Sequence, residues 1–379
     1  MFDKSCHQIS NMKTNVKTLD GLRGIAILLV LIFHFSLKES DGFTSDCFRY
    51  FTLHGAFGVD LFFVLSGFLI SCSLIDSKTK KHFFLNFYIR RVLRVSPIYY
   101  VYLFLCFFIF PGMLDISPYV NKWWLSLVTY TSNFTDLFTR DFITPNISIL
   151  WSLAVEEQFY LVWPIFVFLL GLRGFKRLCL VLILIAFLSR TLMLLTGWSY
   201  QQIYVTTFCR MDSLAFGAYF AAMTKEKNYN SEITTMFARK SLISLGCFYI
   251  ILLGIKSLIG FPKLLFTSFG FLFVGLFMLL LFIIAFHAKS GDFGNRFFSN
   301  KLLVFFGKYS YAMYLFHPIT KIIILKFINK ELYNELINYP IFFQLIFYLV
   351  AISITLFFAI VSWHLIEKHF LAFKKYFYE

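Results

Sequence analysis

The chain contains repeated apolar runs that are each long enough to cross a lipid bilayer. A membrane-spanning helix needs about 20 mostly apolar residues, because its backbone must stay hydrogen-bonded across roughly 30 Å of hydrocarbon. Only 15% of the residues are charged, against about 25% in soluble domains. The sequence therefore predicts an all-α, polytopic membrane helix bundle. Ten spans are expected, at residues 21–37, 55–74, 97–113, 150–170, 178–197, 203–223, 241–260, 264–287, 303–327 and 341–365.

The basic residues indicate how these spans are oriented. Lys and Arg concentrate in the N-terminal segment and in alternate connections, at residues 4–17, 78–94, 173–177, 225–240 and 289–301. The connections between them are near neutral or acidic. Because cytoplasmic loops are enriched in Lys and Arg, we expect both tails, 1–18 and 367–379, in the cytoplasm. The same distribution accounts for the net charge of +15 without a nucleic-acid partner; the expected surroundings are membrane lipids.

The chain shows no sign of division into several domains. No repeat of fixed period and no low-complexity linker interrupts it, so one integral membrane domain is expected over residues 1–379. The seven cysteines have neither a disulfide framework nor zinc-ligand spacing. No metal site is therefore predicted.

Arg23 and His34 lie in the first predicted span, eleven residues apart. Eleven residues make about three helical turns, so both side chains fall on one face, about 16 Å apart along the axis. Ionisable residues inside a span are costly and usually face a cavity or a partner. The pair is therefore a candidate functional site. In the alternative interpretation, Arg23 reaches the lipid head groups and His34 caps the far end of the helix.

Further ionisable residues are expected at the depth of His34, in the outer half of the bundle. They are Asp60, Glu156, Glu157, Arg210 and Asp212. Each must be paired or hydrated to be tolerated there. A purely structural alternative is a set of buried ion pairs, such as Arg210 with Glu156 or Asp212. His317, which precedes a proline in the ninth span, either joins this cavity or hydrogen-bonds across the helix break.

A basic cluster precedes the third span. Arg90 and Arg94 are four residues apart and share a helical face, with Arg91 roughly 100° around the helix. Guanidinium groups bind phosphates through two hydrogen bonds at once, so the cluster suits a donor that carries phosphates at the inner face. Anchoring to lipid head groups is the alternative.

Five stretches of the chain, in this order, resemble the acyltransferase-3 family of integral membrane acyltransferases. They are residues 19–34 with the Arg-x10-His spacing, 58–68 (GVDLFFVLSGF), the arginine cluster 90–94 with Pro97, 151–160 (WSLAVEEQFY) and 307–317 (GKYSYAMYLFH). The similarity runs from about residue 17 to about residue 370. The chain stops after the tenth span, so no appended periplasmic SGNH hydrolase-like domain is expected.

The resemblance implies a membrane O-acetyltransferase. Such an enzyme moves an acyl group, most often acetyl, from cytoplasmic acyl-CoA to a hydroxyl of an extracytoplasmic carbohydrate, such as lipopolysaccharide O-antigen or exopolysaccharide. It also implies a multi-pass protein of the bacterial inner (cytoplasmic) membrane. The resemblance is compatible with a homo-oligomer and with a separate periplasmic partner protein.

Roles for the candidate residues follow from this reaction. His34 is expected to take the proton of the acceptor hydroxyl, because histidine ordinarily titrates near neutral pH. Asp60 or Glu156 would orient its ring, and Arg23 would position the donor. The arginine cluster would hold the phosphates of CoA. Substrate contacts are expected from Trp151, Glu157, Arg210, Asp212 and His317. In a variant mechanism, His34 itself is acylated and then passes the group on.

A secondary transporter or exporter of a lipid-linked or acylated substrate is the competing interpretation. Transporters also carry polar residues near the midplane, commonly in inverted repeats with broken helices. The sequence shows no such internal symmetry. A non-catalytic scaffold would not need Arg23 and His34 aligned on one helical face.

Overall fold

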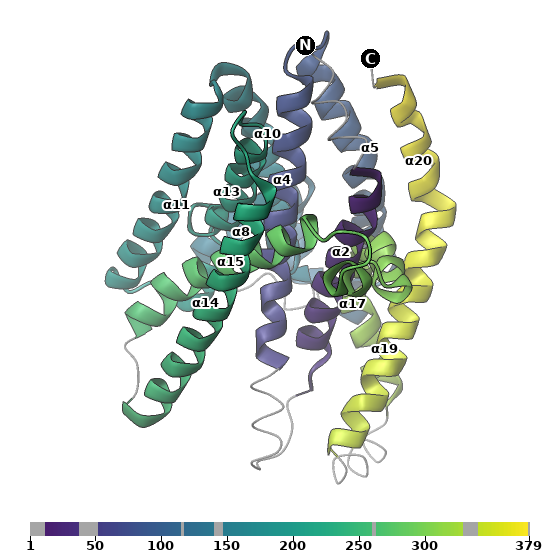
Figure 1. Cartoon of the computed structure of the whole chain (residues 1–379). Coiled ribbons are helices and arrows are strands. Elements are labelled where there is room, and N and C mark those ends of the chain that lie inside the picture. Colours follow the sequence, from purple (N-terminus) through teal and green to yellow (C-terminus); the bar gives the residue numbers. More distant parts are fainter. Residues whose placement is uncertain are drawn as a thin grey trace.

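The computed structural model describes residues 12–37, 52–114, 117–139, 147–259, 263–328 and 340–377. These residues form helices and no strand, which confirms the predicted all-α class. The long helices are α2 (Met12–Phe35), α4 (Gly58–Ser77), α5 (Phe83–Phe104), α10 (Leu150–Leu169), α11 (Leu172–Leu195), α13 (Thr207–Thr224), α14 (Ser231–Ile259), α15 (Lys263–Phe286), α17 (Lys301–Phe327) and α19 (Pro340–Ser362). Figure 1 shows them side by side in a bundle, with α2 and α4 near its centre and α11 and α19 on opposite sides.

Shorter helical segments connect or extend the long ones. They are η1 (His54–Phe57), η2 (Leu105–Ile109), α6 (Pro111–Leu114), α7 (Ser117–Val128), α8 (Ser132–Thr139), α12 (Tyr200–Val205), α16 (Phe293–Phe298), η3 (Trp363–Glu367), α20 (Lys368–Ala372) and η4 (Phe373–Phe377). The last three continue α19, so residues 367–377 of the expected tail extend the final helix.

Seven helical segments of the described chain are long and apolar enough to cross a membrane. They are Lys17–Phe35, His54–Ser77, Phe83–Ile109, Leu150–Leu169, Leu172–Leu195, Thr267–Phe286 and Phe342–Phe377. The other three expected spans fall in α13, α14 and α17, which are helical, but their membrane crossing stays a prediction. The third span begins well before the predicted residue 97, because α5 runs through Pro97 and carries its arginines inside the helix.

Three ion pairs join the basic connections at one end of the bundle. Lys225 pairs with Asp76 at 2.5 Å and Lys289 pairs with Glu232 at 2.8 Å, while Lys176 pairs with Glu226. The first and third of these contacts join the end of α13 to the end of α4 and to the start of α11, and the second joins the end of α15 to the start of α14. The connections that predict a cytoplasmic face therefore share one end of the molecule. The side of the membrane on which that end lies stays a prediction.

Glycines allow α2 and α17 to approach closely at this same end. A Cβ at Gly24 would lie 2.0 Å from the backbone oxygen of Leu303, and one at Gly307 would lie 1.8 Å from that of Asp20. Small residues let membrane helices pack backbone against backbone. The contact fixes Arg23 beside the first turns of α17.

Gly24→Ala is expected to lower the free energy of unfolding by about 1–3 kcal/mol, because the added methyl group must push the two backbones apart. Gly270→Ala in α15 is the matched control, since a Cβ there meets nothing within 4 Å and alanine favours the helix. Thermal unfolding in detergent would compare the two. Equal unfolding midpoints would contradict the close approach of α2 and α17.

Candidate functional site

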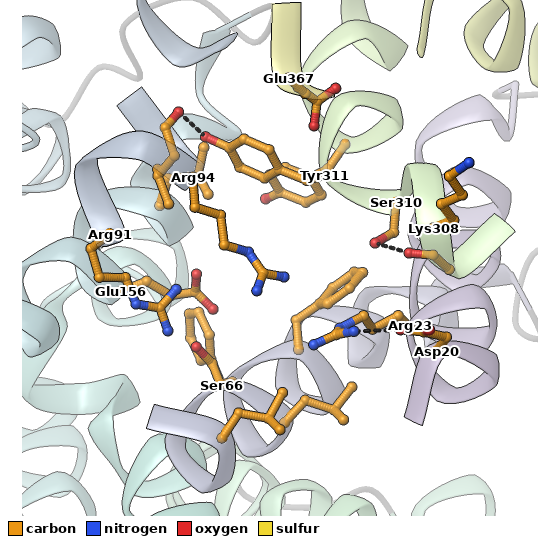
Figure 2. A pocket seen from close by; sticks show the side chains of 18 of the residues that line it. Asp20, Arg23, Ser66, Arg91, Arg94, Glu156, Lys308, Ser310, Tyr311 and Glu367 are labelled. Carbon is orange, nitrogen blue, oxygen red and sulfur yellow. Dashed lines mark hydrogen bonds and ion pairs between the residues drawn. The ribbon is translucent and has the colours of Figure 1, made fainter. Parts of the chain in front are cut away.

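A cavity of about 440 Å³ lies among α2, α4, α5, α10, α17 and the C-terminal segment. Figure 2 shows the side chains of Arg23, Arg91 and Arg94 extending toward one open space from two different helices, α2 and α5. Apolar side chains of α4, including Phe62 and Leu65, line another part of the wall. The cavity thus combines clustered guanidinium groups with an apolar surface.

Two of these arginines have no carboxylate partner in the described parts of the chain. Arg23 pairs with Asp20 at 2.5 Å, but neither Arg91 nor Arg94 forms such an ion pair. The guanidinium of Arg91 instead lies 4.3 Å from the centroid of the Tyr160 ring, a cation–π contact. Arg94 points toward the middle of the cavity. Neither guanidinium is held in a direct ion pair within the described residues, although Glu156 interacts electrostatically with both.

Arg90 does not join its two neighbours, which corrects the prediction of a single three-arginine cluster at the site. Its guanidinium donates to the backbone oxygen of Phe377 at 3.0 Å. On a helix, Arg94 falls between Arg90 and Arg91 in angle. The cavity covers the flank that carries Arg91, while the flank that carries Arg90 faces the C-terminal segment.

Glu156 is the acidic residue of α10 that lines the cavity. Its carboxylate lies near Arg91 and Ser66, and Ser66 is hydrogen-bonded to Tyr160. Glu157 is not among the lining residues, although it interacts electrostatically with Arg91. Sequence reasoning placed both glutamates with His34, whereas the structure places Glu156 with the arginines.

His34 and His317 form a separate pair next to this cavity. Their ring centroids are 4.7 Å apart, and neither residue lines the cavity. Tyr314 does line it, and the centroid of its ring is 5.6 Å from that of His317. Lys321 donates to the backbone oxygen of His34 and holds the end of α2. The histidine pair therefore lies behind Tyr314, about three helical turns along α2 from Arg23.

The carboxylate expected beside His34 is absent among the described residues, because Asp60 and Glu156 have other partners. Asp60 accepts hydrogen bonds from Arg210 at 3.0 and 3.1 Å and from Ser213 at 2.8 Å. Both members of the ion pair are almost fully buried. Neither Asp60 nor Glu156 therefore makes a contact through which it could orient the ring of His34.

The remaining candidates surround this buried ion pair. The guanidinium of Arg210 lies 5.6 Å from the ring centroid of Trp151 and 4.8 Å from that of Tyr204. Asp212 pairs with Arg190 at 2.7 Å, also fully buried. The suggested pairing of Arg210 with Glu156 or Asp212 was therefore wrong, since the partner is Asp60. The cluster ties together α4, α11 and α13.

Sequence reasoning missed several residues of these sites. Arg190 lies inside a predicted span, so the rule that flags intramembrane charges would have found it. Lys374 and Glu367 line the cavity from the C-terminal segment. Their positions depend on how that segment packs against α5, and no local sequence signal reports this.

Comparisons with known proteins identify the family of this chain. Residues 16–364 match the acyltransferase-3 family model, described as an acyltransferase domain. The O-acetyltransferase OatA of Staphylococcus aureus is 30% identical over 376 residues, which cover 92% of this chain and 56% of that protein. The peptidoglycan O-acetyltransferase OatA of Listeria monocytogenes is 30% identical over 332 residues, covering 80% and 49% respectively. The chain spans about half the length of these relatives, and no solved structure matches it. The chain belongs to the acyltransferase-3 family.

Proposed function

We propose that this protein is a membrane O-acyltransferase that moves an acyl group, acetyl first of all, from acyl-CoA to a carbohydrate hydroxyl. The observation that carries the proposal is the cavity in which Arg91 and Arg94 present guanidinium groups that form no direct ion pair with a carboxylate among the described residues. Membership of the acyltransferase family supports the reaction class. The names of its relatives support O-acetylation.

The chemistry of the donor matches the lining of the cavity. CoA carries a 3′-phosphate and a diphosphate, which suit Arg91, Arg94 and Lys374, whereas its long arm suits the apolar wall of α4. The cavity reaches Ser152 and Tyr314, whose hydroxyls are 2.5 Å apart. In this proposal the phosphates bind at the arginines and the thioester extends toward Tyr314.

Transfer to the acceptor then uses His34. As the acceptor oxygen attacks the acyl carbon, its proton passes to the imidazole; the carbon–sulfur bond then breaks, and the CoA thiolate takes that proton. Because Tyr314 lies between the cavity and the histidine pair, its side chain must shift to let the acyl carbon meet His34. Acylation of His34 itself is the alternative order of events.

The acceptor is proposed to be a glycan outside the cytoplasmic membrane. The name of the Listeria relative specifies peptidoglycan, so peptidoglycan comes before lipopolysaccharide and exopolysaccharide as the acceptor to be tested. The membrane location, the cytoplasmic termini and the ten-span topology belong to the same proposal.

The proposed function can be tested with purified protein in lipid nanodiscs. Supplied with radiolabelled acetyl-CoA and soluble peptidoglycan fragments, the protein should release free CoA and yield fragments heavier by one acetyl group in mass spectra. Other glycans tested in parallel would identify the acceptor class. A protein that carries label across a sealed membrane without releasing CoA would instead support the transporter interpretation.

Arg94→Ala is expected to raise the apparent KM for acetyl-CoA, since a charge-assisted hydrogen bond contributes about 1.5–3 kcal/mol. Lys374→Ala should act in the same direction. Lys375→Ala is the matched control, because this neighbour is exposed and lies over the ring of Tyr376 rather than in the cavity. Steady-state kinetics would separate KM from kcat. Equal effects of the two lysine variants would show that the C-terminal segment does not contribute to donor binding.

A further inference from the structure

We propose that His317 positions His34 by accepting a hydrogen bond from its imidazole ring. The inference rests on the proposed function, in which His34 handles the proton of the acceptor. It assigns His317 a role through His34, in place of the direct substrate contact expected from the sequence.

The contacts of His317 define which of its nitrogens carries the proton. Nδ1 lies 2.7 Å from the backbone oxygen of Tyr314. A carbonyl oxygen only accepts, so Nδ1 must donate, and in a neutral ring Nε2 is then an acceptor. His317 is 1% exposed, and its Nε2 has no hydrogen-bond partner within the described chain. A buried acceptor without a donor is costly.

His34 is the ring N–H group best placed to satisfy this acceptor. Its centroid is 4.7 Å from that of His317, and the planes are tilted by 52°. The neighbouring rings of Phe33 and Phe35 offer no polar hydrogen. Lys321 is the charged neighbour of the pair, and its ammonium is directed at the backbone oxygens of His34 and Ser36. The proposed hydrogen bond forms when His34 turns one ring N–H toward Nε2 of His317, since the rings are neighbours but are not hydrogen-bonded in the structure.

This contact decides which nitrogen of His34 acts as the base. With one nitrogen donating to His317, the other is unprotonated and takes the proton from the acceptor hydroxyl as the oxygen–acyl bond forms. The N–H directed at His317 stays in place throughout. The proton gained is returned to the CoA thiolate when the carbon–sulfur bond breaks. His317 thus does for His34 what a carboxylate does in a catalytic triad, without a net charge.

Two amide substitutions separate this role from a structural one. In His317→Asn the amide nitrogen replaces Nδ1 and keeps the bond to Tyr314, but the acceptor at Nε2 is lost. In His317→Gln the amide oxygen replaces Nε2, but the bond to Tyr314 is lost. We expect the Asn variant to lose about 10- to 100-fold in kcat and the Gln variant to stay within a few-fold of wild type. KM for acetyl-CoA should be unchanged in both.

The proposal predicts that the Gln variant has a higher kcat than the Asn variant. Equal activity, or higher activity of the Asn variant, would overturn the proposal. An inactive wild-type protein would refute the proposed function instead, so the two failures are distinguishable. Nitrogen NMR of the wild-type protein labelled at histidine gives a readout independent of any variant. A proton on Nδ1 of His317 is expected, and a proton on Nε2 would overturn the inference.

Discussion

His34→Gln is expected to lower kcat for acyl transfer by about 10²–10⁴-fold, the usual contribution of a positioned acid–base group. Glutamine retains hydrogen bonding but cannot take the proton of the acceptor hydroxyl. Donor binding should be unchanged, because Arg91 and Arg94 lie on α5 and Arg23 lies about three helical turns from His34 along α2. CoA release in the presence of acceptor would measure kcat, and titration with a non-hydrolysable acyl-CoA would measure donor affinity.

The same variant distinguishes the two orders of transfer. If His34 is acylated, wild-type protein given labelled donor alone should retain the label and the Gln variant should not. If His34 acts as a base, neither protein should retain it. A Gln variant with near-normal transfer would contradict both and make His34 a structural residue.

The helices could be predicted from the sequence because apolar run length depends only on local composition. Seven of the expected spans correspond to helical segments that are long and apolar enough to cross a membrane, and the other three fall in helices α13, α14 and α17. The boundaries were less accurate where charge lies inside a helix. α5 begins at Phe83 and holds its arginines within the helix, because arginine favours the helical conformation and these side chains face a cavity and the C-terminal segment rather than lipid.

The sequence identified many residues of the candidate site, but it did not predict which of them contact one another. Residues at one expected depth were assigned to a single cluster, yet α4 and α13 direct Asp60 and Arg210 toward each other, while α10 directs Glu156 toward Arg91. Even the expected depth was wrong for Glu156, which lies with Arg91 rather than with His34. The direction around a helix axis depends on crossing angles that only the packed bundle defines. The contact between His34 and His317 also depends on this packing, so the sequence could not predict it.

The buried ion pair between Asp60 and Arg210 is expected to dominate the stability of the α4–α13 contact. Removing one partner leaves a buried charge without compensation, which costs about 3–5 kcal/mol. Arg210→Met should therefore lower the free energy of unfolding by about that amount. Lys289→Ala, which breaks an exposed ion pair with Glu232, is the control and should change stability little.

The double variant Asp60→Leu/Arg210→Met shows whether the charge or the shape of the pair matters. Replacing both partners of a buried ion pair with apolar residues of similar volume is often neutral or stabilising. The double variant should thus recover most of the stability lost by Arg210→Met in thermal unfolding. If it also recovers acyl transfer, the pair is a structural link between helices. If it folds but remains inactive, Asp60 and Arg210 contribute to the reaction itself, as the sequence first suggested. A double variant as unstable as Arg210→Met would contradict the idea that the uncompensated carboxylate causes the loss.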